Sequence, residues 1–420
     1  MKILITISAI ALVVLLALVS LGWLIYGRSP TPPTPSNLLE KTQSLLDEQV
    51  LLGDIGQMLM VGFRGASILD SEHSISDSVN NVSDILNNLS DSTYIVDIIN
   101  DLAIGGAIFF DYDLPSKSFP RNIINPSQTK QLIIDLQSIS EIPLFIAVDA
   151  EGGNINRLKP KYGFVDIVSA KEIGNASSTE FAKQQASKMA VQLKNLGFNM
   201  NFAPVIDVDV NPNNPVIGGL GRAFSQNPEK VTQFAQIFIE EQRKSSIISV
   251  VKHFPGHGSS KGDSHLGLTD ITETYQAMEL EPYQKLQEQG MIDAVMTAHI
   301  INKEIDKENP ATLSPLFIND ILRQKIGFNG VVISDDMQMK AIADQYSLRE
   351  SIIKAINAGC DIILLSNNTF VGYNEDLPYE VKDIIHEAVL NGEISRGKIA
   401  ESAKRIRDLK KRFDLINITN

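Results

Sequence analysis

From residue 38 onward, short apolar runs alternate with longer amphipathic stretches. Eight of the runs are nearly free of polar residues, which is typical of strands buried on both faces of a parallel sheet. The predicted strands are residues 57–63, 104–110, 144–149, 198–204, 247–253, 292–299, 330–335 and 361–366. Elsewhere, apolar positions recur with a helical period, for example in residues 179–196, 228–244, 272–289 and 394–413.

Eight strand–helix units in succession predict an α/β fold, a (β/α)8 barrel of the TIM type. The alternative is an open, doubly wound sheet, which usually carries a glycine-rich phosphate-binding loop after its first strand. The sequence shows no such loop. The barrel is therefore the favoured prediction.

Polar residues stand at the carboxyl ends of four predicted strands. Asp149 ends the third run, His253 the fifth, His299 the sixth and Asp335 the seventh. In a barrel, the carboxyl ends of all strands open onto one face, and that face holds the active site. The sequence therefore predicts that these four side chains share one polar pocket.

The N-terminal segment is predicted to be a membrane anchor. Residues 3–26 contain no charged side chain, and a helix of this length reaches roughly 36 Å, enough to cross a bilayer core. Trp23 and Tyr26 lie at the end of the run, where aromatic side chains favour the membrane interface. The alternative is a cleaved signal peptide, which usually has a shorter apolar core and a small-residue cleavage site; none follows Tyr26.

The predicted organisation is a transmembrane segment at residues 1–28, a Pro-rich linker at 29–37 and a single domain at 38–420. Proline stands at four positions of the linker, which favours an extended, semi-rigid spacer. Lys2 precedes the apolar run and is expected to stay inside. The domain would then be exported and membrane-anchored, on a periplasmic or extracellular face.

Composition and charge restrict the partners of this domain. Hydrophobic residues make up 43% of the chain and charged residues 21%, which is typical of a globular protein and excludes general disorder. A single cysteine, Cys360, excludes a disulfide-stapled scaffold. Asp and Glu outnumber Lys and Arg by 50 to 37, so the net charge is -13 and no nucleic-acid partner is expected. Nothing in the sequence implies an obligate protein partner.

The densest cluster of chemically active side chains is the segment KHFPGHG at residues 252–258, followed by DSH at 263–265. Four of the six histidines stand at positions 253, 257, 265 and 299. Glycine and proline in the first segment disfavour a helix, so these residues are predicted to form a loop that leaves the fifth strand. A loop of this kind can carry a catalytic group over a bound substrate.

The acidic pair Asp335 and Asp336 is the second candidate for chemistry. A carboxylate directly after a buried strand is held firmly and partly removed from water, which suits a nucleophile. An aspartate at this place can also cap the next helix. Asp336 is predicted to be that cap, which leaves Asp335 facing the pocket.

These motifs resemble those of glycoside hydrolase family 3, and within it the single-domain bacterial β-N-acetylglucosaminidases, or β-hexosaminidases. The resemblance extends roughly from residue 51 to residue 409. It also rests on IGQML at 55–59, IGGAI at 104–108, DAEGG at 149–153, NFAPVID at 201–207 and SDD at 334–336. The KHFPGHG and DSH motifs are the most specific, because they mark the N-acetylglucosaminidase branch.

The resemblance implies a role for each matching residue. Asp335 would be the nucleophile, and His265 the general acid/base with Asp263 as its partner. The residues that bind the sugar would be Asp149, Arg157, Arg222, Lys252 and His253. The implied activity is that of a retaining exo-β-N-acetylglucosaminidase without cofactor or metal. It would release terminal N-acetylglucosamine from peptidoglycan-derived saccharides, such as muropeptides, or from similar glycosides.

The residue types suit this reaction. A retaining glycosidase needs an anionic nucleophile and a second group that first protonates the leaving oxygen and then deprotonates water. An imidazole, with an unperturbed pKa of about 6.5, can do both near neutral pH. Asp263, which lies two residues before His265, can orient the ring and stabilise the imidazolium.

Three alternatives stay open. The same fold would suit a β-glucosidase or an N-acetylglucosaminide phosphorylase, since a histidine acid/base tolerates an incoming phosphate better than a carboxylate does. A catalytically silent sugar-binding protein is the second, although every implied catalytic residue is present. The third is a metal-dependent hydrolase, in which imidazoles and carboxylates would bind zinc. Its ligands would come from His253, His257, Asp263, His265 and His299.

The anchor is expected to remain attached to the protein. N-terminal sequencing of membrane-extracted protein should begin at Met1 or Lys2, because no cleavage site follows the apolar run. A mature protein that begins near Ser29 would contradict the anchor and support a cleaved signal peptide.

Overall fold

The structure is a computed structural model that describes residues 35–68, 94–264, 266–370 and 372–416. The chain divides into two compact units, Met1–Val50 and Leu51–Asn420, and helix α2 (Pro35–Gln57) runs across their boundary. Within the described ranges, no helix is both long and apolar enough to cross a membrane. The predicted anchor at residues 3–26 lies outside those ranges.

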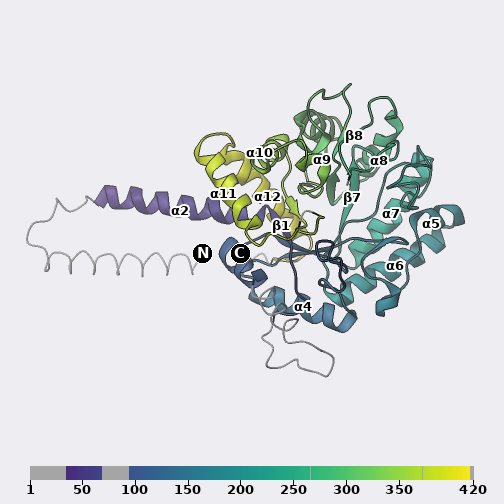
Figure 1. The fold of residues 1–420 in the computed structure, drawn as a ribbon, viewed down its shortest axis with the longest axis horizontal. Coiled ribbons are helices and arrows are strands. Elements are labelled where there is room, and N and C mark those ends of the chain that lie inside the picture. The colour runs from purple at the N-terminus through teal and green to yellow at the C-terminus, as the bar shows by residue number, and fades with distance from the viewer. Residues whose placement is uncertain (1–34, 69–93, 265, 371, 417–420) are drawn as a thin grey trace, which may run out of the picture. The chain divides into compact units, whose positions relative to one another are not determined.

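An eight-stranded parallel sheet forms the centre of the second unit (Figure 1). Its strands are β1 (Leu59–Gly62), β2 (Gly106–Phe109), β3 (Phe145–Val148), β6 (Met200–Asn201), β7 (Ile248–Phe254), β9 (Ala294–Thr297), β11 (Val331–Ile333) and β12 (Ile363–Leu365). From β1 to β11, each of these strands pairs with the next one along the chain, and β12 pairs with β1. A parallel bridge between Ile333 and Ile362 links β11 to the segment before β12, so the sheet forms a nearly closed barrel.

All eight predicted strands are therefore confirmed; seven have shorter bounds, and β7 is shifted by one residue from the predicted 247–253. Every residue of the eight strands is buried. Burial on both faces explains why the runs do not alternate between apolar and polar residues. Cys360, which directly precedes the last strand region, is buried in the same core.

Helical segments follow the strands and surround the sheet (Figure 1). They are residues 94–102, α4 (Pro126–Ile139), η2 (Pro160–Tyr162), α5 (Ala170–Ala176), α6 (Thr179–Leu196), α7 (Pro228–Lys244), η3 (Ala277–Leu280), α8 (Glu281–Glu288), η4 (Ala311–Leu313), η5 (Leu316–Lys325), α9 (Lys340–Ala343), α10 (Leu348–Ala358), α11 (Leu377–Leu390) and α12 (Arg396–Arg412). Helices α6 and α7 have the predicted bounds.

Capping residues explain where these helices begin and end. The Ser178 side chain accepts a hydrogen bond from the Phe181 N–H at the start of α6. Helix α6 ends at Gly197, whose φ of 98° lies in the left-handed region that favours glycine. Asn227 caps α7 in the same way as Ser178 caps α6, and Pro228 occupies its first turn, where no N–H is needed.

The predicted helix over residues 272–289 is wrong in its first half. These residues form turns and the short η3, and α8 begins only at Glu281. Pro282 in the first turn of α8 favours a helix start there, because proline cannot supply the N–H that an interior position requires. The Glu279 side chain is bonded to the backbone N–H groups of Gln276 and Ser259.

Short extra strands occur in the loops that leave the carboxyl ends of the barrel. Strands β4 (Ala150–Gly152) and β5 (Ile155–Asn156) form an antiparallel pair after β3. Strands β8 (Thr269–Asp270) and β10 (Ile300–Ile301) pair in parallel after β7 and β9. These loops form the face on which the chemistry of a barrel is expected.

The opposite end of the barrel is held together by buried polar contacts. Lys410 of α12 is fully buried, and its Nζ donates to Oε1 of Gln57 at 2.8 Å, just before β1. The Asp361 carboxylate accepts from the Val332 N–H at 2.9 Å and from Arg323 at 2.8 Å and Arg405 at 3.0 Å. One carboxylate therefore ties β11, η5 and α12 together.

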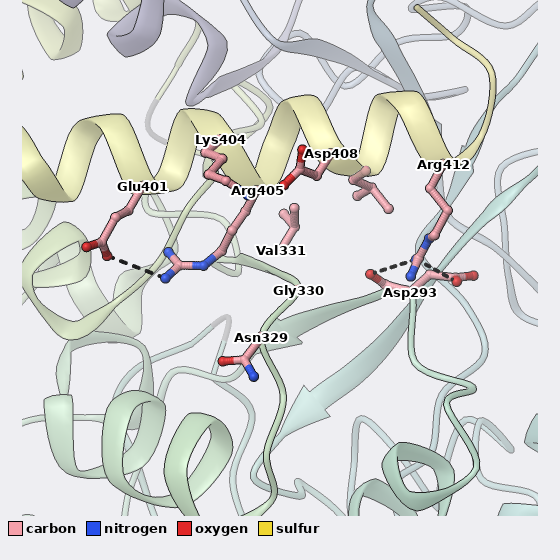
Figure 2. A pocket seen from close by; sticks show the side chains of 10 residues that line it. Asp293, Asn329, Gly330, Val331, Glu401, Lys404, Arg405, Asp408 and Arg412 are labelled. Carbon is pink, nitrogen blue, oxygen red and sulfur yellow. Dashed lines mark hydrogen bonds and ion pairs between the residues drawn. The ribbon is translucent and has the colours of Figure 1, made fainter. Parts of the chain in front are cut away.

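A cavity of about 330 Å³ lies at this end, between α12 and the segments that lead into β9 and β11 (Figure 2). Its charged side chains are already paired. Arg412 lies 2.8 Å from Asp293, Arg405 lies 3.5 Å from Glu401, and Lys404 lies 2.6 Å from Asp408. The cavity is therefore a gap in a network of ion pairs, far along the strands from the predicted pocket.

Candidate active site

A larger cavity, of about 540 Å³, lies at the carboxyl ends of the strands. Residues that end or follow β2, β3, β7, β9, β11 and β12 contribute to its wall. Each predicted site residue in the described ranges lines it: Asp149, Arg157, Arg222, Lys252, His253, Asp263 and Asp335. The eighth, His265, lies outside the described residues.

Three of the four polar residues at strand ends share this cavity, and the fourth does not. Asp149, His253 and Asp335 line it, but His299 is fully buried elsewhere. The Nε2 of His299 donates to the carbonyl oxygen of Asp336 at 2.9 Å, and its Nδ1 lies 2.9 Å from Thr312 Oγ1. The prediction is therefore wrong for His299, which supports the backbone of the β11 loop.

A chain of buried ions lines one side of the cavity. Lys252 Nζ lies 2.7 Å from Asp149 Oδ1 and 2.8 Å from Glu151 Oε1. Arg222 makes two hydrogen bonds to Glu151, from Nε at 2.8 Å and from Nη2 at 2.7 Å. We call Asp149, Lys252, Glu151 and Arg222 the ion chain. Its charges alternate in sign, and no side chain in it is more than 16% exposed.

The alternating charges decide the protonation of the two carboxylates. Burial alone would raise the pKa of Asp149, but Lys252 and Arg157 outweigh it and hold the pKa well below its usual range. Burial also opposes ionisation of Glu151, but Arg222 and Lys252 lower the pKa of that carboxyl. Both groups are therefore anions at neutral pH.

His253 continues the ion chain as a neutral group. Arg222 Nη2 lies 3.1 Å from His253 Nε2, and a guanidinium can only donate, so Nε2 is the acceptor. The proton is therefore on Nδ1, which donates to Asp207 Oδ2 at 2.7 Å. Burial, followed by the charges of Arg222 and Lys252, holds the pKa of His253 well below its usual value.

Asp207 holds both the end of β7 and the loop that follows it. Its Oδ1 accepts from the backbone N–H of His253 at 3.2 Å and of His257 at 2.8 Å. Burial raises the pKa of Asp207, while these N–H donors favour its ionised form. The carboxyl therefore serves as an anchor for the loop and for the tautomer of His253.

The loop after β7 is held closely against the barrel at its base. A Cβ on Gly258 would lie 1.7 Å from the carbonyl oxygen of Val208, so only glycine fits. Glu279 Oε2 accepts from the Ser259 N–H at 3.1 Å, and the Tyr275 hydroxyl donates to the Pro255 carbonyl at 3.1 Å. Asp263, farther along the loop, lines the cavity.

The acidic pair after β11 is arranged differently from the prediction. The Asp336 N–H donates to Asp335 Oδ1 at 2.8 Å. Asp336 does not cap α9, whose N-cap is Met339. Its carboxylate instead accepts from the Ser366 N–H at 3.1 Å and the Gln338 N–H at 3.2 Å. Asp336 thus ties the end of β11 to the end of β12, which holds Asp335 at the cavity wall.

Sequence reasoning missed Glu151, Asp207 and Asp336 as parts of the site. Glu151 and Asp207 lie within the DAEGG and NFAPVID motifs, so both residues stood in segments that had already been identified as candidates. The signal that finds them is electrostatic. Buried cations such as Lys252 and Arg222 require nearby anions, and an acidic residue in a neighbouring motif can supply one.

The metal-dependent alternative receives no support from the described part of the chain. Within it, no group of three or more His, Cys, Asp or Glu side chains is arranged to hold a metal ion. His299 is bonded to Thr312 and Asp336 and does not line the cavity.

Comparison with known proteins gives one consistent family. Residues 51–409 match the model of the glycosyl hydrolase family 3 N terminal domain. A β-hexosaminidase of Tolumonas auensis is 34% identical over 275 residues, which cover 65% of this chain and 78% of that protein. β-Hexosaminidase A of Pseudoalteromonas piscicida is 31% identical over 328 residues, 73% of this chain and 54% of that protein.

Comparison with solved structures points to the same family. A family 3 β-N-acetylglucosaminidase from Paenibacillus sp. FPU-7 superposes with a TM-score of 0.73 at 30% identity. The matched region covers 88% of this chain and 64% of the Paenibacillus chain, so this chain spans less than two thirds of that structure.

Glu151→Gln is expected to lower the free energy of unfolding by roughly 3–5 kcal/mol, because it leaves Lys252 and Arg222 buried without their shared anion. Denaturant unfolding measures the change. The matched control is Glu387→Gln, since Glu387 is 64% exposed in its ion pair with Arg349; this change should cost about 0.5 kcal/mol or less. Equal stability of the two variants would contradict the inference that the ion chain stabilises the fold.

The stability difference between the wild-type protein and Glu151→Gln should depend on pH. The pKa of Glu151 is lower in the folded state than in the unfolded chain. Its contribution is therefore fully present above the usual glutamate pKa and is lost as the pH falls through the folded value. The stability difference between wild type and Glu151→Gln should shrink in acid, and a difference that grows in acid would contradict the assignment.

Proposed function

The chain belongs to glycoside hydrolase family 3, and we propose that it is a retaining exo-β-N-acetylglucosaminidase. Its substrates would be peptidoglycan-derived or similar glycosides, from which it releases terminal N-acetylglucosamine. The observation that carries this proposal is the single cavity that brings Asp335 and Asp263 together with the ion chain at the carboxyl end of the barrel. The β-hexosaminidase names of its relatives support the same substrate class.

Asp335 is the proposed nucleophile. Its carboxylate would attack the anomeric carbon, and the bond from that carbon to the leaving oxygen would break. A covalent glycosyl-enzyme results, with inverted configuration at the anomeric carbon. Attack by water from the opposite side would then restore the configuration and free Asp335.

His265 and Asp263 are the proposed proton carriers. The imidazolium of His265 would protonate the departing oxygen, and the neutral ring would then take a proton from the attacking water. Asp263 lines the cavity and would orient the ring and stabilise its charged form. In the sequence, His265 follows Asp263 by two residues. The base of the loop that contains Asp263 is held by Asp207 and Glu279.

The ion chain would hold the terminal sugar. Asp149, Lys252 and Arg222 present charged donors and acceptors to the cavity, and Arg157 lies 3.5 Å from Asp149 and 5.5 Å from the Phe110 ring. Because these groups already satisfy one another, their positions are set before substrate arrives. Such fixed polar groups discriminate strongly against a substrate that lacks a matching hydrogen-bonding group.

The proposal extends to location. Residues 1–28 would anchor the protein in a membrane, residues 29–37 would act as a spacer, and the barrel would act on saccharides outside the cytoplasm. The uncharged run at residues 3–26 supports this arrangement.

Substrate preference tests the proposed function. The purified protein should hydrolyse an aryl β-N-acetylglucosaminide with a kcat/KM roughly 10²-fold or more above that for the matching aryl β-glucoside. The reverse preference would identify a β-glucosidase. Reaction in phosphate buffer should yield free N-acetylglucosamine, and a sugar phosphate as the main product would instead identify a phosphorylase.

Substitutions should separate the roles of Asp335 and His265. Asp335→Ala should lose activity toward every substrate, because no glycosyl-enzyme can form. His265→Ala should retain more activity toward a dinitrophenyl glycoside than toward a poor leaving group, because dinitrophenolate needs little protonation. Added azide, which needs no general base, should raise turnover of His265→Ala and give the β-glycosyl azide.

Asp263→Asn should behave as a milder form of His265→Ala, since the imidazole remains but loses its charged partner. An equal loss for good and poor leaving groups in His265→Ala would show that His265 only binds substrate. Rescue of Asp335→Ala by azide, without rescue of His265→Ala, would overturn both assignments.

A further inference from the structure

Three aromatic side chains lie on the loops that follow β2 and β3. Tyr112 lines the cavity and is 39% exposed, which places it at the cavity mouth. Phe119 is 40% exposed, although one face of its ring is stacked on Tyr162. The two ring centroids are 4.2 Å apart, and the ring planes differ by 9°. We call Tyr112, Phe119 and Tyr162 the aromatic rim.

A turn brings Phe119 next to Tyr112 at the cavity mouth. Asp113 and Ser118 exchange backbone hydrogen bonds of 2.9 and 3.1 Å and form an antiparallel bridge. Beyond this bridge, the Arg121 N–H donates to the Asp111 carbonyl at 3.1 Å, so the two arms stay paired and the backbones of Tyr112 and Phe119 lie beside each other. The arm that carries Phe119, with Tyr162 stacked on its ring, therefore lies beside Tyr112 at the cavity mouth.

The turn that carries Tyr112 and Phe119 is held by several hydrogen bonds. Arg64 donates to both carboxylate oxygens of Asp113, at 3.0 and 2.8 Å. Asn368, which follows β12, accepts from the Leu114 N–H at 2.8 Å and donates to the Tyr112 carbonyl at 3.1 Å. A rigid aromatic surface binds a ligand with little loss of conformational entropy.

The stack of Phe119 on Tyr162 is not needed to join the two loops. Lys159 already forms an ion pair with the buried Asp111, which links the β3 loop to the β2 loop. A ring that served only for packing would be expected to be covered, but Phe119 remains 40% exposed. Exposed aromatic surface that continues a ligand cavity is typical of a binding site.

We propose that the aromatic rim binds the sugar chain on the leaving-group side of the substrate, as a stacking surface for the second and third sugars. This inference rests on the proposed function, since an exo-acting enzyme holds the terminal sugar in the cavity and leaves the rest of the chain at the mouth. The C–H faces of pyranose rings pack against flat aromatic rings, which suits Phe119 and Tyr112. The ligand class is a β-linked amino-sugar oligosaccharide.

Chain length provides the test. For each protein, kcat/KM is measured for the linear trisaccharide of β-1,4-linked N-acetylglucosamine and for the aryl β-N-acetylglucosaminide, and the two values are expressed as a ratio. In Phe119→Ala, the ratio should fall roughly three- to tenfold relative to wild type, because the stacking ring is lost. Phe119→Tyr should keep the ratio within about twofold, since the ring face remains.

Two further variants make the result specific. Phe119→Leu keeps apolar bulk without a flat ring, and its ratio should fall as in Phe119→Ala. Val191→Ala, an exposed apolar residue of α6 outside the cavity lining, should leave the ratio unchanged. Thermal unfolding of each variant should show that the fold is retained.

The proposal would be overturned if the ratio in Phe119→Ala, or in Phe119→Leu, were equal to that of the wild-type protein. An equal loss for both substrates would also overturn it, because the ring would then act on the cavity and not on the sugar chain. Failure of the proposed function is seen separately, as absence of hydrolysis of the aryl glycoside by the wild-type protein.

Discussion

The site depends on one constraint, which is that ionised groups removed from water must neutralise one another. Taking a single ion out of water costs several kcal/mol even after the protein relaxes. Lys252 and Arg222 therefore require Asp149 and Glu151 beside them, and the distances of 2.7 to 2.8 Å show that the requirement is met. Loops from different parts of the barrel are joined by this one network.

The constraint explains why the site residues come from separate strands. Asp149 and Glu151 follow β3, and Lys252 and His253 end β7, so the barrel must bring the two strand ends to one face before the charges can pair. His253 stays neutral because burial disfavours its charged form, and the positive charges of Arg222 and Lys252 add to that effect by lowering its pKa further. The fold and the protonation states are thus set together.

The pattern of apolar and polar residues along the chain was enough to predict the barrel. Each strand is a buried apolar run of a few residues, and the bounds of α6 and α7 follow from nearby caps. The predicted helix at residues 272–289 was wrong in its first half, where Glu279 bonds the backbone of another loop, at Ser259. Such a contact joins residues that are far apart in the sequence, and helical periodicity carries no information about it.

The candidate site was predicted in outline only. Asp149, His253 and Asp335 were placed correctly at the cavity because strand ends converge in a barrel. His299 and Asp336 differ from prediction because their hydrogen-bond partners, Thr312 and Ser366, come from other parts of the chain. The catalytic roles, including that of His265, remain predictions, since a role depends on chemistry as well as position.

The contacts at the end of the barrel opposite the cavity also bring the first and last parts of the barrel domain together. Gln57 and Lys410 share a hydrogen bond of 2.8 Å, Asp54 and Arg407 lie 2.7 Å apart, and β1 pairs directly with β12. A short peptide could therefore join the ends of the barrel at little cost in loop entropy. The domain is thus suited to circular permutation, with new termini opened in a surface loop while the order of strands around the barrel is unchanged.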